Sequence, residues 1–380
     1  MTDQPAHPLT GLKVVELARI LAGPWAGQIF ADLGAEVIKI ESAAGDDTRQ
    51  WGPPFVTYAD GSSDAAYFHA ANRGKTSVVI DFATPAGQAQ VKALIADADV
   101  LIENFKVGTL AKYRLDYASL SALNPRLVYC SITGFGQDGP YASRPGYDFI
   151  IQGMSGIMDL TGNPDGPPQK IGVAFADIMT GLYAVIAIQA ALAARGTSGR
   201  GEHIDMALFD VMTGVLANQA QNYLVTGQSP RRLGNAHPNI TPYAVFPVSD
   251  GWFILAVGND GQFRKFCTVM GLDALAQDAR FTSNALRLEH RAVLEVLIGE
   301  ATRLHPRDAL LALLENAGVP AGPINSVADA FADPQIVARA MQQQFESPDG
   351  QGIAGVRTPI RFKHMALKLG AAAPRLGAED

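Results

Sequence analysis

The chain has 380 residues, a formal net charge of −7 and 48% hydrophobic residues. This length allows two domains with a sizeable core, and the acidic balance argues against a nucleic-acid partner. Two cysteines suggest no disulfide framework, and the polar N-terminus MTDQPAHPLTG is unlike a signal peptide. No uninterrupted apolar stretch reaches membrane-spanning length, so we expect a cytoplasmic protein without a membrane partner.

Strand-like and helix-like segments alternate through the first part of the chain. In chain order they are strand 13–17, helix 24–34, strand 36–42, strand 76–82, helix 85–98, strand 99–105 and strand 127–136. The first three form one βαβ unit, in which Pro24 marks a helix start and Gly34 a helix end. This alternation predicts a parallel sheet with helices on both faces.

The composition changes near residue 225. Residues 241–257 predict two strands around a Ser-Asp-Gly turn, and amphipathic helices follow at 260–271, 290–304 and 306–318. From residue 346 strand and turn signals return. We therefore predict an α/β fold with a Rossmann-like large domain at 1–224, a smaller α+β domain at 225–325, and a C-terminal segment, 326–380, that returns to the large domain.

The sequence lacks the motifs of several common kinds of site. A nicotinamide site needs G-x-G-x-x-G after the first strand, but the turn reads ARILAGPWAG. The segment QGMSGI does not have the spacing of a hydrolase nucleophile elbow. The histidines are scattered, so we expect no metal site and no tightly bound cofactor.

Cationic and aromatic side chains follow successive predicted strands. Loops at this edge of an open parallel sheet converge on the ligand, and arginine and lysine bind phosphates well. Each charge alone is more typical of a solvated surface, but the group favours a phosphate-bearing ligand. Its members are Arg49, Trp51, Arg73, Lys75, Lys106, Lys112 and Arg144.

Asp177 is a lone acid in the apolar run GVAFADIMTGLYAV (172–185). A carboxylate in such surroundings loses hydration and needs compensation. It could be the N-cap of the helix that follows, since aspartate is a favoured cap. It could also be a nucleophile, because a helix N-terminus stabilises a carboxylate. The residues alone leave both interpretations open.

Longer motifs resemble one family across nearly the whole chain. They are GLKVVELARILAGPWAGQIFADLGAEVIKIE (11–41), GDDTRQWGPPF (45–55), NRGKTSVVIDF (72–82), DVLIENFKVGTL (99–110), SITGFGQDGPYASRPGYD (131–148), ADIMTGLYA (176–184) and SGRGEHIDMALFD (198–210). Together they resemble the class III coenzyme A transferases, the family of formyl-CoA transferase and carnitine CoA-transferase. The resemblance implies an interlocked homodimer that uses acyl-CoA and a free carboxylic acid.

The resemblance also implies roles for individual residues. Asp177 matches the family nucleophile, which forms a mixed anhydride with the acyl group and then an aspartyl-CoA thioester. The family pattern departs at Ser42, where an arginine is common, and at Leu21, which argues against formate chemistry. With the strand-end cations included, the expected CoA-binding residues are Ile20, Leu21, Ala22, Arg73, Lys75, Ile80, Asp81, Asn104, Phe105, Lys106, Lys112, Arg144, Gly146, Tyr147 and Asp148.

Two other functions are compatible with a chain of this kind. The α-methylacyl-CoA racemases are similar in sequence but carry a histidine where Tyr147 stands, and a phenol is a poor base at neutral pH. A catalytically silent CoA-binding protein would use Asp177 only as a cap.

The resemblance is strongest to the branch that moves CoA from succinyl-CoA to dicarboxylates such as glutarate. Arg231 and Arg232 are further candidates to bind the second carboxylate of a dicarboxylate substrate. An exposed linker to the small domain is an equally good interpretation of that stretch. The expected substrate residues are Arg49, Trp51, His237, Asn239, Gly258 and Gly261.

Overall fold

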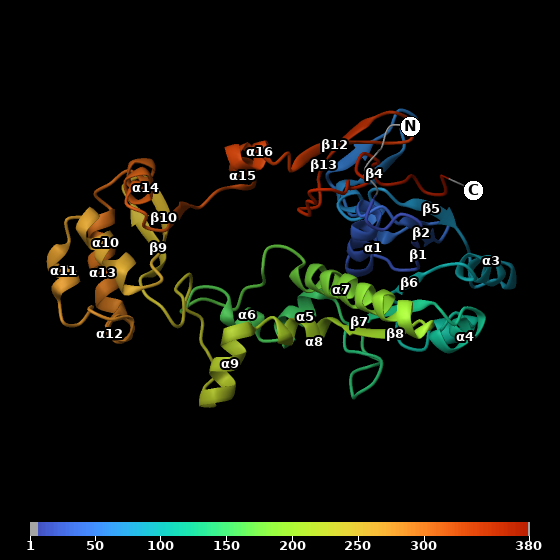
Figure 1. Ribbon diagram of the computed structural model, residues 1–380, viewed down its shortest axis with the longest axis horizontal. Helices are drawn as coiled ribbons and strands as arrows, with labels where there is room; N and C mark the ends of the chain where they lie inside the picture. The colour runs from blue at the N-terminus through green and yellow to red at the C-terminus, as the bar shows by residue number, and fades with distance from the viewer. Residues whose placement is uncertain (1–6, 379–380) are drawn as a thin grey trace. The chain divides into compact units, whose positions relative to one another are not determined.

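The computed structural model describes residues 7–378 and divides the chain into two compact units (Figure 1). The large unit runs to Ile157 and also contains Lys170–Gln228 and the segment from Pro334 onward. The small unit contains Met158–Gln169 and Ser229–Asp333. The domain bounds predicted from the sequence are at residues 225 and 326. The expectation did not include the short segment Met158–Gln169 in the small unit.

A six-stranded parallel sheet forms the centre of the large unit. Its spatial order is β5-β2-β1-β6-β7-β8, so the order reverses between β1 and β6. In open parallel sheets such a reversal leaves a crevice at the carboxyl ends of the strands, where ligands bind. The strands are β1 (Lys13–Glu16), β2 (Glu36–Glu41), β5 (Thr76–Val79), β6 (Val100–Glu103), β7 (Val128–Thr133) and β8 (His203–Ala207).

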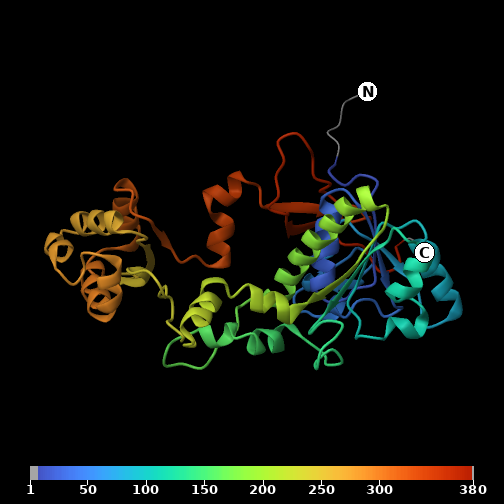
Figure 2. The same cartoon turned by 60° about the horizontal axis from the view of Figure 1, so that its bottom comes forward.

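Helices cover both faces of this sheet because successive strand residues point to opposite sides. Val14 contributes to a core with α1 (Ala22–Asp32) and α7 (Phe175–Ser198), while Val15 contributes to a core with α3 (Pro85–Ile95) and α4 (Tyr117–Leu123). Helices α1 and α7 lie side by side (Figure 2). Gly181 permits this contact, since a Cβ there would meet the Ala22 carbonyl oxygen at 2.7 Å.

Shorter elements surround the sheet. Before β6 they are η1 (Asp47–Gln50), β3 (Phe55–Thr57), β4 (Ser63–Ala65) and α2 (Ala66–His69), and after it come η2 (Leu110–Tyr113), α5 (Asp148–Met154), α6 (Ile157–Leu160), α8 (Leu208–Gly214) and α9 (Ala217–Thr226).

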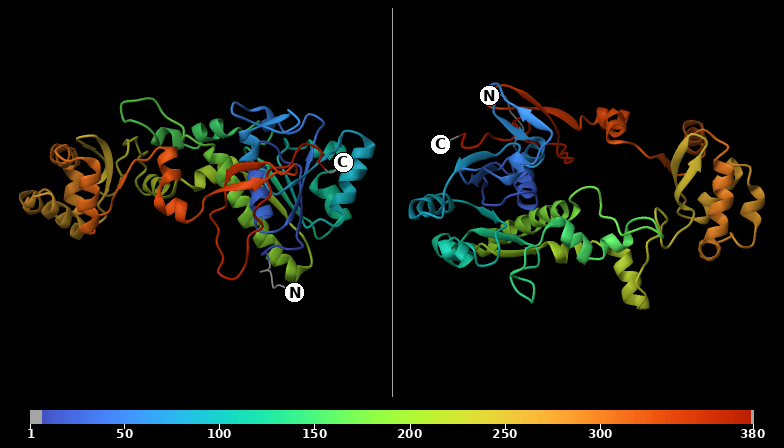
Figure 3. Two further views of the ribbon diagram at one scale, coloured as in Figure 1. Left: turned by 90° about the horizontal axis from the view of Figure 1, so that it is seen from above. Right: turned by 180° about the vertical axis from the view of Figure 1, so that it is seen from behind.

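The C-terminal segment packs on the N-terminal half of the large unit, in a hairpin of β12 (Gln342–Glu346) and β13 (Gly352–Val356) (Figure 3). The Gly74 N–H donates to the Ala372 carbonyl at 3.1 Å, and the Gly377 N–H donates to Ser77 Oγ at 3.2 Å. These two hydrogen bonds attach the end of the described chain to β5 and to the residues just before it.

The small unit has its own core beneath a three-stranded antiparallel sheet of order β11-β10-β9. Phe253, Phe263, Phe266 and Phe281 are fully buried in it. The elements are β9 (Tyr243–Val248), β10 (Gly251–Ala256), α10 (Asp260–Val269), α11 (Asp273–Gln277), α12 (Asn284–Glu289), α13 (Arg291–Thr302), α14 (Arg307–Asn316), β11 (Ala321–Pro323) and α15 (Val327–Ala332), and α16 (Pro334–Ala338) follows in the large unit.

Among the described helices, α7 is the one long and apolar enough to cross a membrane, with a mean hydropathy of 1.6. The core helix of a soluble protein meets the same measure. One side of α7 is buried at residues that include Ala184 and Ile188. Leu182, Tyr183 and Ile186 on the same helix are exposed.

Candidate active site

A cavity of about 430 Å³ opens in the large unit where the carboxyl ends of β1, β6 and β7 meet the first turn of α7. This volume lies within the range of small-molecule pockets. Asp177 lies in its wall, together with the turn before α1, the loop after β6 and the loop before α5. The lining residues are Arg19, Ile20, Leu21, Ala22, Asp47, Trp51, Asn104, Phe105, Lys106, Val107, Thr109, Ile132, Thr133, Gly134, Ala142, Arg144, Pro145, Gly146, Tyr147, Asp148, Asp177 and Leu208.

Asp177 is not the N-cap of α7, contrary to one of the two interpretations of the sequence. The N-cap is Ala174, and Asp177 is the third residue of the helix. The capping acceptor is the Asp148 Oδ1 atom, which accepts hydrogen bonds from the N–H groups of Ala176 at 2.7 Å and Asp177 at 3.3 Å. Since Asp148 supplies the cap, the Asp177 side chain is left for another role.

Asp148 is itself held in place. Gln152 donates from Nε2 to Asp148 Oδ2 at 2.7 Å and accepts from the Ile171 N–H at 2.9 Å. Both oxygens of Asp148 are thus engaged within the fold. Asp148 also lines the pocket, and its contact with CoA stays a prediction.

Asp177 lacks a compensating partner in the described part of the chain, where no hydrogen bond or ion pair reaches its carboxylate. Burial, followed by the neighbouring Asp148 carboxylate, raises the pKa of Asp177 to about 7. Several buried acids of this unit are paired with cations, for example Glu16 with Lys39 and Lys75, whereas the buried Glu103 accepts from the Phe105 N–H instead and does not line this pocket. An unpaired carboxylate in a pocket is available for chemistry.

Tyr67 of α2 lies near Asp177, and Trp51 packs edge-on against it with ring centroids 5.4 Å apart. Burial, followed by the charges of Asp177, Asp148 and Asp46, raises the pKa of Tyr67 to about 12. Tyr67 therefore keeps its hydroxyl proton at neutral pH. Trp51, a predicted substrate residue, lines the pocket and is 47% exposed.

The turn before α1 contributes residues to the pocket wall whose backbone N–H groups are not used within the described fold. Leu21 and Ala22 line the cavity, and among residues 7–378 no acceptor is found for their N–H groups. Asn104 fixes the turn, accepting from the Arg19 N–H at 2.9 Å and donating to the Arg19 carbonyl at 2.7 Å. Free N–H groups at a helix start bind anions and developing oxyanions.

Three cations line the pocket, namely Arg19, Lys106 and Arg144. Lys106 and Arg144 were expected from the sequence. Arg19 was not, although it directly follows β1 in the same manner. Its guanidinium forms an ion pair with Asp47 at 3.1 Å and lies 5.8 Å from the centre of the Phe105 ring.

Other predicted cations lie elsewhere and have buried partners. Arg73 pairs with Asp32 and donates to the Val356 carbonyl at 2.8 Å, and Lys75 pairs with Glu16 at 2.8 Å. Arg49, expected at the substrate, instead pairs with Glu41 and Asp64. These three side chains support the fold, because the free energy of burying a cation must be offset by such partners.

Three further predicted CoA contacts are not in the pocket wall. Ile80 is a core residue, and the Asp81 carboxylate accepts from the Ala83 N–H at 3.0 Å in the turn before α3. Lys112 is in η2 and does not line the cavity. By contrast, the lining includes Ile20, Phe105, Gly146 and Tyr147 as expected.

The predicted substrate residues after 225 belong to the small unit and are not part of this wall. His237 accepts from the Asn239 N–H at 3.0 Å. Gly258 donates its N–H to Gln262 at 2.7 Å, and Gly261 lies within α10. Arg232 pairs with Asp159 at 2.8 Å.

Sequence reasoning missed Arg19, Tyr67 and the capping role of Asp148. The position of Arg19 at the end of β1 was a usable signal, but the cap joins residues 28 positions apart. No cluster of three histidine, cysteine or acidic side chains that could hold a metal ion is present among residues 7–378.

A family model described as CoA-transferase family III matches residues 9–380. The chain belongs to this family. It is therefore a CoA-transferase, an enzyme that acts on CoA thioesters. A protein of Agrobacterium fabrum named succinate–glutarate CoA-transferase is 58% identical to it over 99% of this chain and 95% of its own. Human succinyl-CoA:glutarate CoA-transferase is 38% identical over 97% of this chain and 84% of its own.

Solved structures agree with the family match. A CAIB/BAIF family protein from Brucella suis is 62% identical, with a TM-score of 0.88, and the match covers 99% of this CoA-transferase and 97% of that chain. Rv3272 from Mycobacterium tuberculosis is 29% identical, with a TM-score of 0.87, over 99% and 98% of the two chains.

Proposed function

We propose that this CoA-transferase moves CoA from succinyl-CoA to a free dicarboxylate of the glutarate type, with Asp177 as the nucleophile. The names and identities of the relatives support the substrates. The observation that carries the assignment of Asp177 is its carboxylate, which lies in the pocket wall without a hydrogen bond or ion pair from residues 7–378.

The exchange proceeds through two anhydrides. The Asp177 carboxylate attacks the succinyl thioester carbon, the carbon–sulfur bond breaks, and CoA leaves as the thiolate. The thiolate then attacks the aspartyl carbonyl, releasing succinate and leaving an aspartyl-CoA thioester. Glutarate attacks this thioester to form the second anhydride and free thiolate. The thiolate takes the glutaryl group and regenerates the Asp177 carboxylate.

The remaining pocket residues have roles that follow from their chemistry. The free N–H groups of Leu21 and Ala22 are suited to the oxyanion of each tetrahedral intermediate. The amides at the start of α7 are already bound by Asp148. Arg19, Lys106 and Arg144 suit the CoA phosphates and together offset the missing arginine at Ser42.

The large unit is, in this proposal, a Rossmann-like CoA-binding domain of an interlocked homodimer in the cytoplasm, without a tightly bound cofactor. The exposed apolar residues Leu182, Tyr183 and Ile186 of α7 support a partner copy, because such surface is usually covered. Interlocked chains cannot separate without unfolding. Sedimentation at nanomolar concentration should therefore show a dimer, and a monomer there would contradict the proposal.

Trapping the intermediate tests the role of Asp177. Incubation with succinyl-CoA and no acceptor, followed by hydroxylamine, should convert Asp177 to a hydroxamate on the tryptic peptide 171–195. A racemase only moves a proton on its substrate, and a silent CoA-binding protein forms no adduct, so both predict an unmodified peptide. An unmodified Asp177 in enzyme that is turning over would refute the mechanism. A panel of acids offered with succinyl-CoA then identifies the acceptor.

A further inference from the structure

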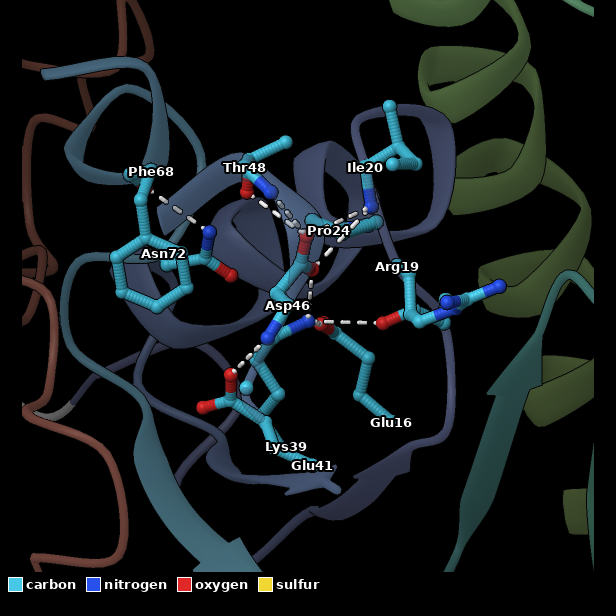
Figure 4. Close-up of polar contacts among 12 residues, drawn as sticks. Glu16, Arg19, Ile20, Pro24, Lys39, Glu41, Asp46, Thr48, Phe68 and Asn72 are labelled. Atoms are coloured by element: carbon cyan, nitrogen blue, oxygen red, sulfur yellow. Dashed lines mark hydrogen bonds and ion pairs between the residues drawn. The ribbon is translucent and has the colours of Figure 1, made fainter. Parts of the chain in front are cut away.

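Side chains bind four successive backbone polar groups of the turn from Ala18 to Ile20. Figure 4 shows Lys39 and Asp46 at this turn. The Ala18 carbonyl accepts from Lys39 Nζ at 2.8 Å, and Asn104 binds both the N–H and the carbonyl of Arg19. The Ile20 N–H donates to the Asp46 carboxylate at 3.2 Å. Three separate segments thus determine the path of this turn.

The backbone at Ile20 is strained, with φ at 69°. A β-branched side chain strongly disfavours this left-handed region, and such strain persists only where surrounding contacts impose it. Ile20 leads directly into Leu21 and Ala22, which line the pocket. The strain is therefore located next to the part of the chain suited to binding an oxyanion.

Lys39 is fully buried, and its ammonium group has three acceptors. These are Glu16 Oε1 at 3.0 Å, Asp46 Oδ2 at 2.9 Å and the Ala18 carbonyl at 2.8 Å. All three ammonium protons are thereby used. Burial by itself lowers the pKa of Lys39, but the charges of Glu16, Asp46 and Glu41 outweigh it and raise the pKa, so the residue stays cationic.

Asp46 is fixed from its other side as well. Its Oδ1 atom accepts from the N–H and the hydroxyl of Thr48 at 3.0 and 2.8 Å, and its own N–H donates to Glu41 at 2.8 Å. Burial tends to raise the pKa of Asp46, but Lys39 and the Thr48 hydrogen bonds lower it overall. Asp46 therefore presents an ionised, immobile carboxylate to the Ile20 N–H.

Stability alone does not explain buried ions at this place, because well-packed apolar side chains stabilise a core equally well or better. We propose that Lys39 and Asp46 are positioning residues for the reaction: they hold the Ala18–Ile20 turn so that the N–H groups at the start of α1 are available to the substrate on Asp177. This inference rests on the proposed function for its catalytic consequence, but the hold on the turn is independent of it.

The test compares Asp46→Asn with Asp32→Asn in the full-length enzyme. Asp46→Asn removes the charge paired with Lys39 while keeping the shape of the side chain. Asp32 is also buried and paired, with Arg73 Nε at 2.9 Å from its Oδ1, but it does not line the pocket. It therefore controls for the general loss of a buried ion pair, with thermal unfolding measured for both variants.

Asp46→Asn should raise amide hydrogen exchange in peptides that cover residues 17–25 by at least tenfold. It should lower kcat for succinyl-CoA and glutarate by about 10- to 100-fold, with KM for succinyl-CoA within about threefold, since a misplaced oxyanion donor costs this much. Asp32→Asn should change neither, although its unfolding temperature falls similarly.

Unchanged exchange in 17–25, or a kcat within twofold of wild type in folded Asp46→Asn, would overturn the positioning role. An equal kcat loss in Asp32→Asn would also overturn it. Lys39→Met, which removes the cation, gives a second measurement on the same turn if Asp46→Asn does not fold. A wild-type enzyme without transfer activity would count against the proposed function alone, because the exchange measurement still decides whether the turn is held.

Discussion

Replacing the nucleophile should make the protein more stable. In the fold the pKa of Asp177 is about 7, while its ordinary value is 3.8. A shift of about three units corresponds to ~4 kcal/mol of cost for ionising the buried carboxylate at pH 8. The side chain is partly exposed to the pocket, and solvent screening reduces this cost to ~1–2 kcal/mol. Asp177→Asn avoids the charge and should gain that amount while losing turnover.

The stability that Asp177→Asn gains over wild type should increase as the pH rises. Between pH 4 and 7 the folded protein holds a proton on Asp177 that the unfolded chain releases, so wild-type stability falls as pH rises through this window. Asp177→Asn has no such group, and its advantage should grow from near zero at pH 4.5 to a few degrees of unfolding temperature at pH 8.

Thermal unfolding of both proteins at equal concentration from pH 4.5 to 8.5 measures this difference. Asp210→Asn, which changes an exposed aspartate of α8, serves as the matched control and should show a pH-independent offset. A difference between wild type and Asp177→Asn that stays constant across the range would refute the argument from desolvation.

Three further results are expected. Asp148→Asn removes the negative charge beside Asp177 and should lower the pKa of Asp177. The acid limb of the pH profile of kcat/KM should then lie at lower pH than the wild-type limb near pH 7. An acid limb that does not move would show that burial alone raises the pKa of Asp177. Asn104→Ala removes both hydrogen bonds to the Arg19 backbone and should reduce kcat about tenfold or more in a steady-state transfer assay. An unchanged kcat would show that the turn is held without Asn104. Arg73→Lys loses the two-point contact with Asp32 and should lower the unfolding temperature, while KM for succinyl-CoA stays within twofold of wild type. A tenfold rise in KM would show that Arg73 contacts CoA.

Local patterns in the sequence predicted the elements around the site, but not which charges are buried. The segments 13–17, 24–34 and 36–42 correspond to β1, α1 and β2 because their periodicity depends on near neighbours. Arg49 and Arg73 were expected at ligands, since a charged residue looks the same in sequence whether solvated or paired. Their partners lie in other segments, at Asp64 and Asp32.

The site itself was predictable where a motif carried it. Asp177 was found from its unusual surroundings and the family pattern, and the structure excludes its capping role. The cap could not be foreseen because Asp148 reaches α7 from a different loop, and only the tertiary fold brings the two together. Tyr67 was missed for the same reason, since its position near Asp177 depends on the packing of α2.

The C-terminal return of the chain also sets an order of events during synthesis. The buried guanidinium of Arg49 donates to the Pro374 carbonyl at 3.2 Å, and the N–H groups of Gly74 and Gly377 donate to the Ala372 carbonyl and to Ser77 Oγ. A ribosome that has made the six strands of the sheet must still translate residues Ser229–Asp333 of the small unit before these partners emerge, a delay on the order of ten seconds. Throughout that interval Arg49, Gly74 and Ser77 lack these C-terminal partners, so the large unit can complete its packing only once translation is nearly over.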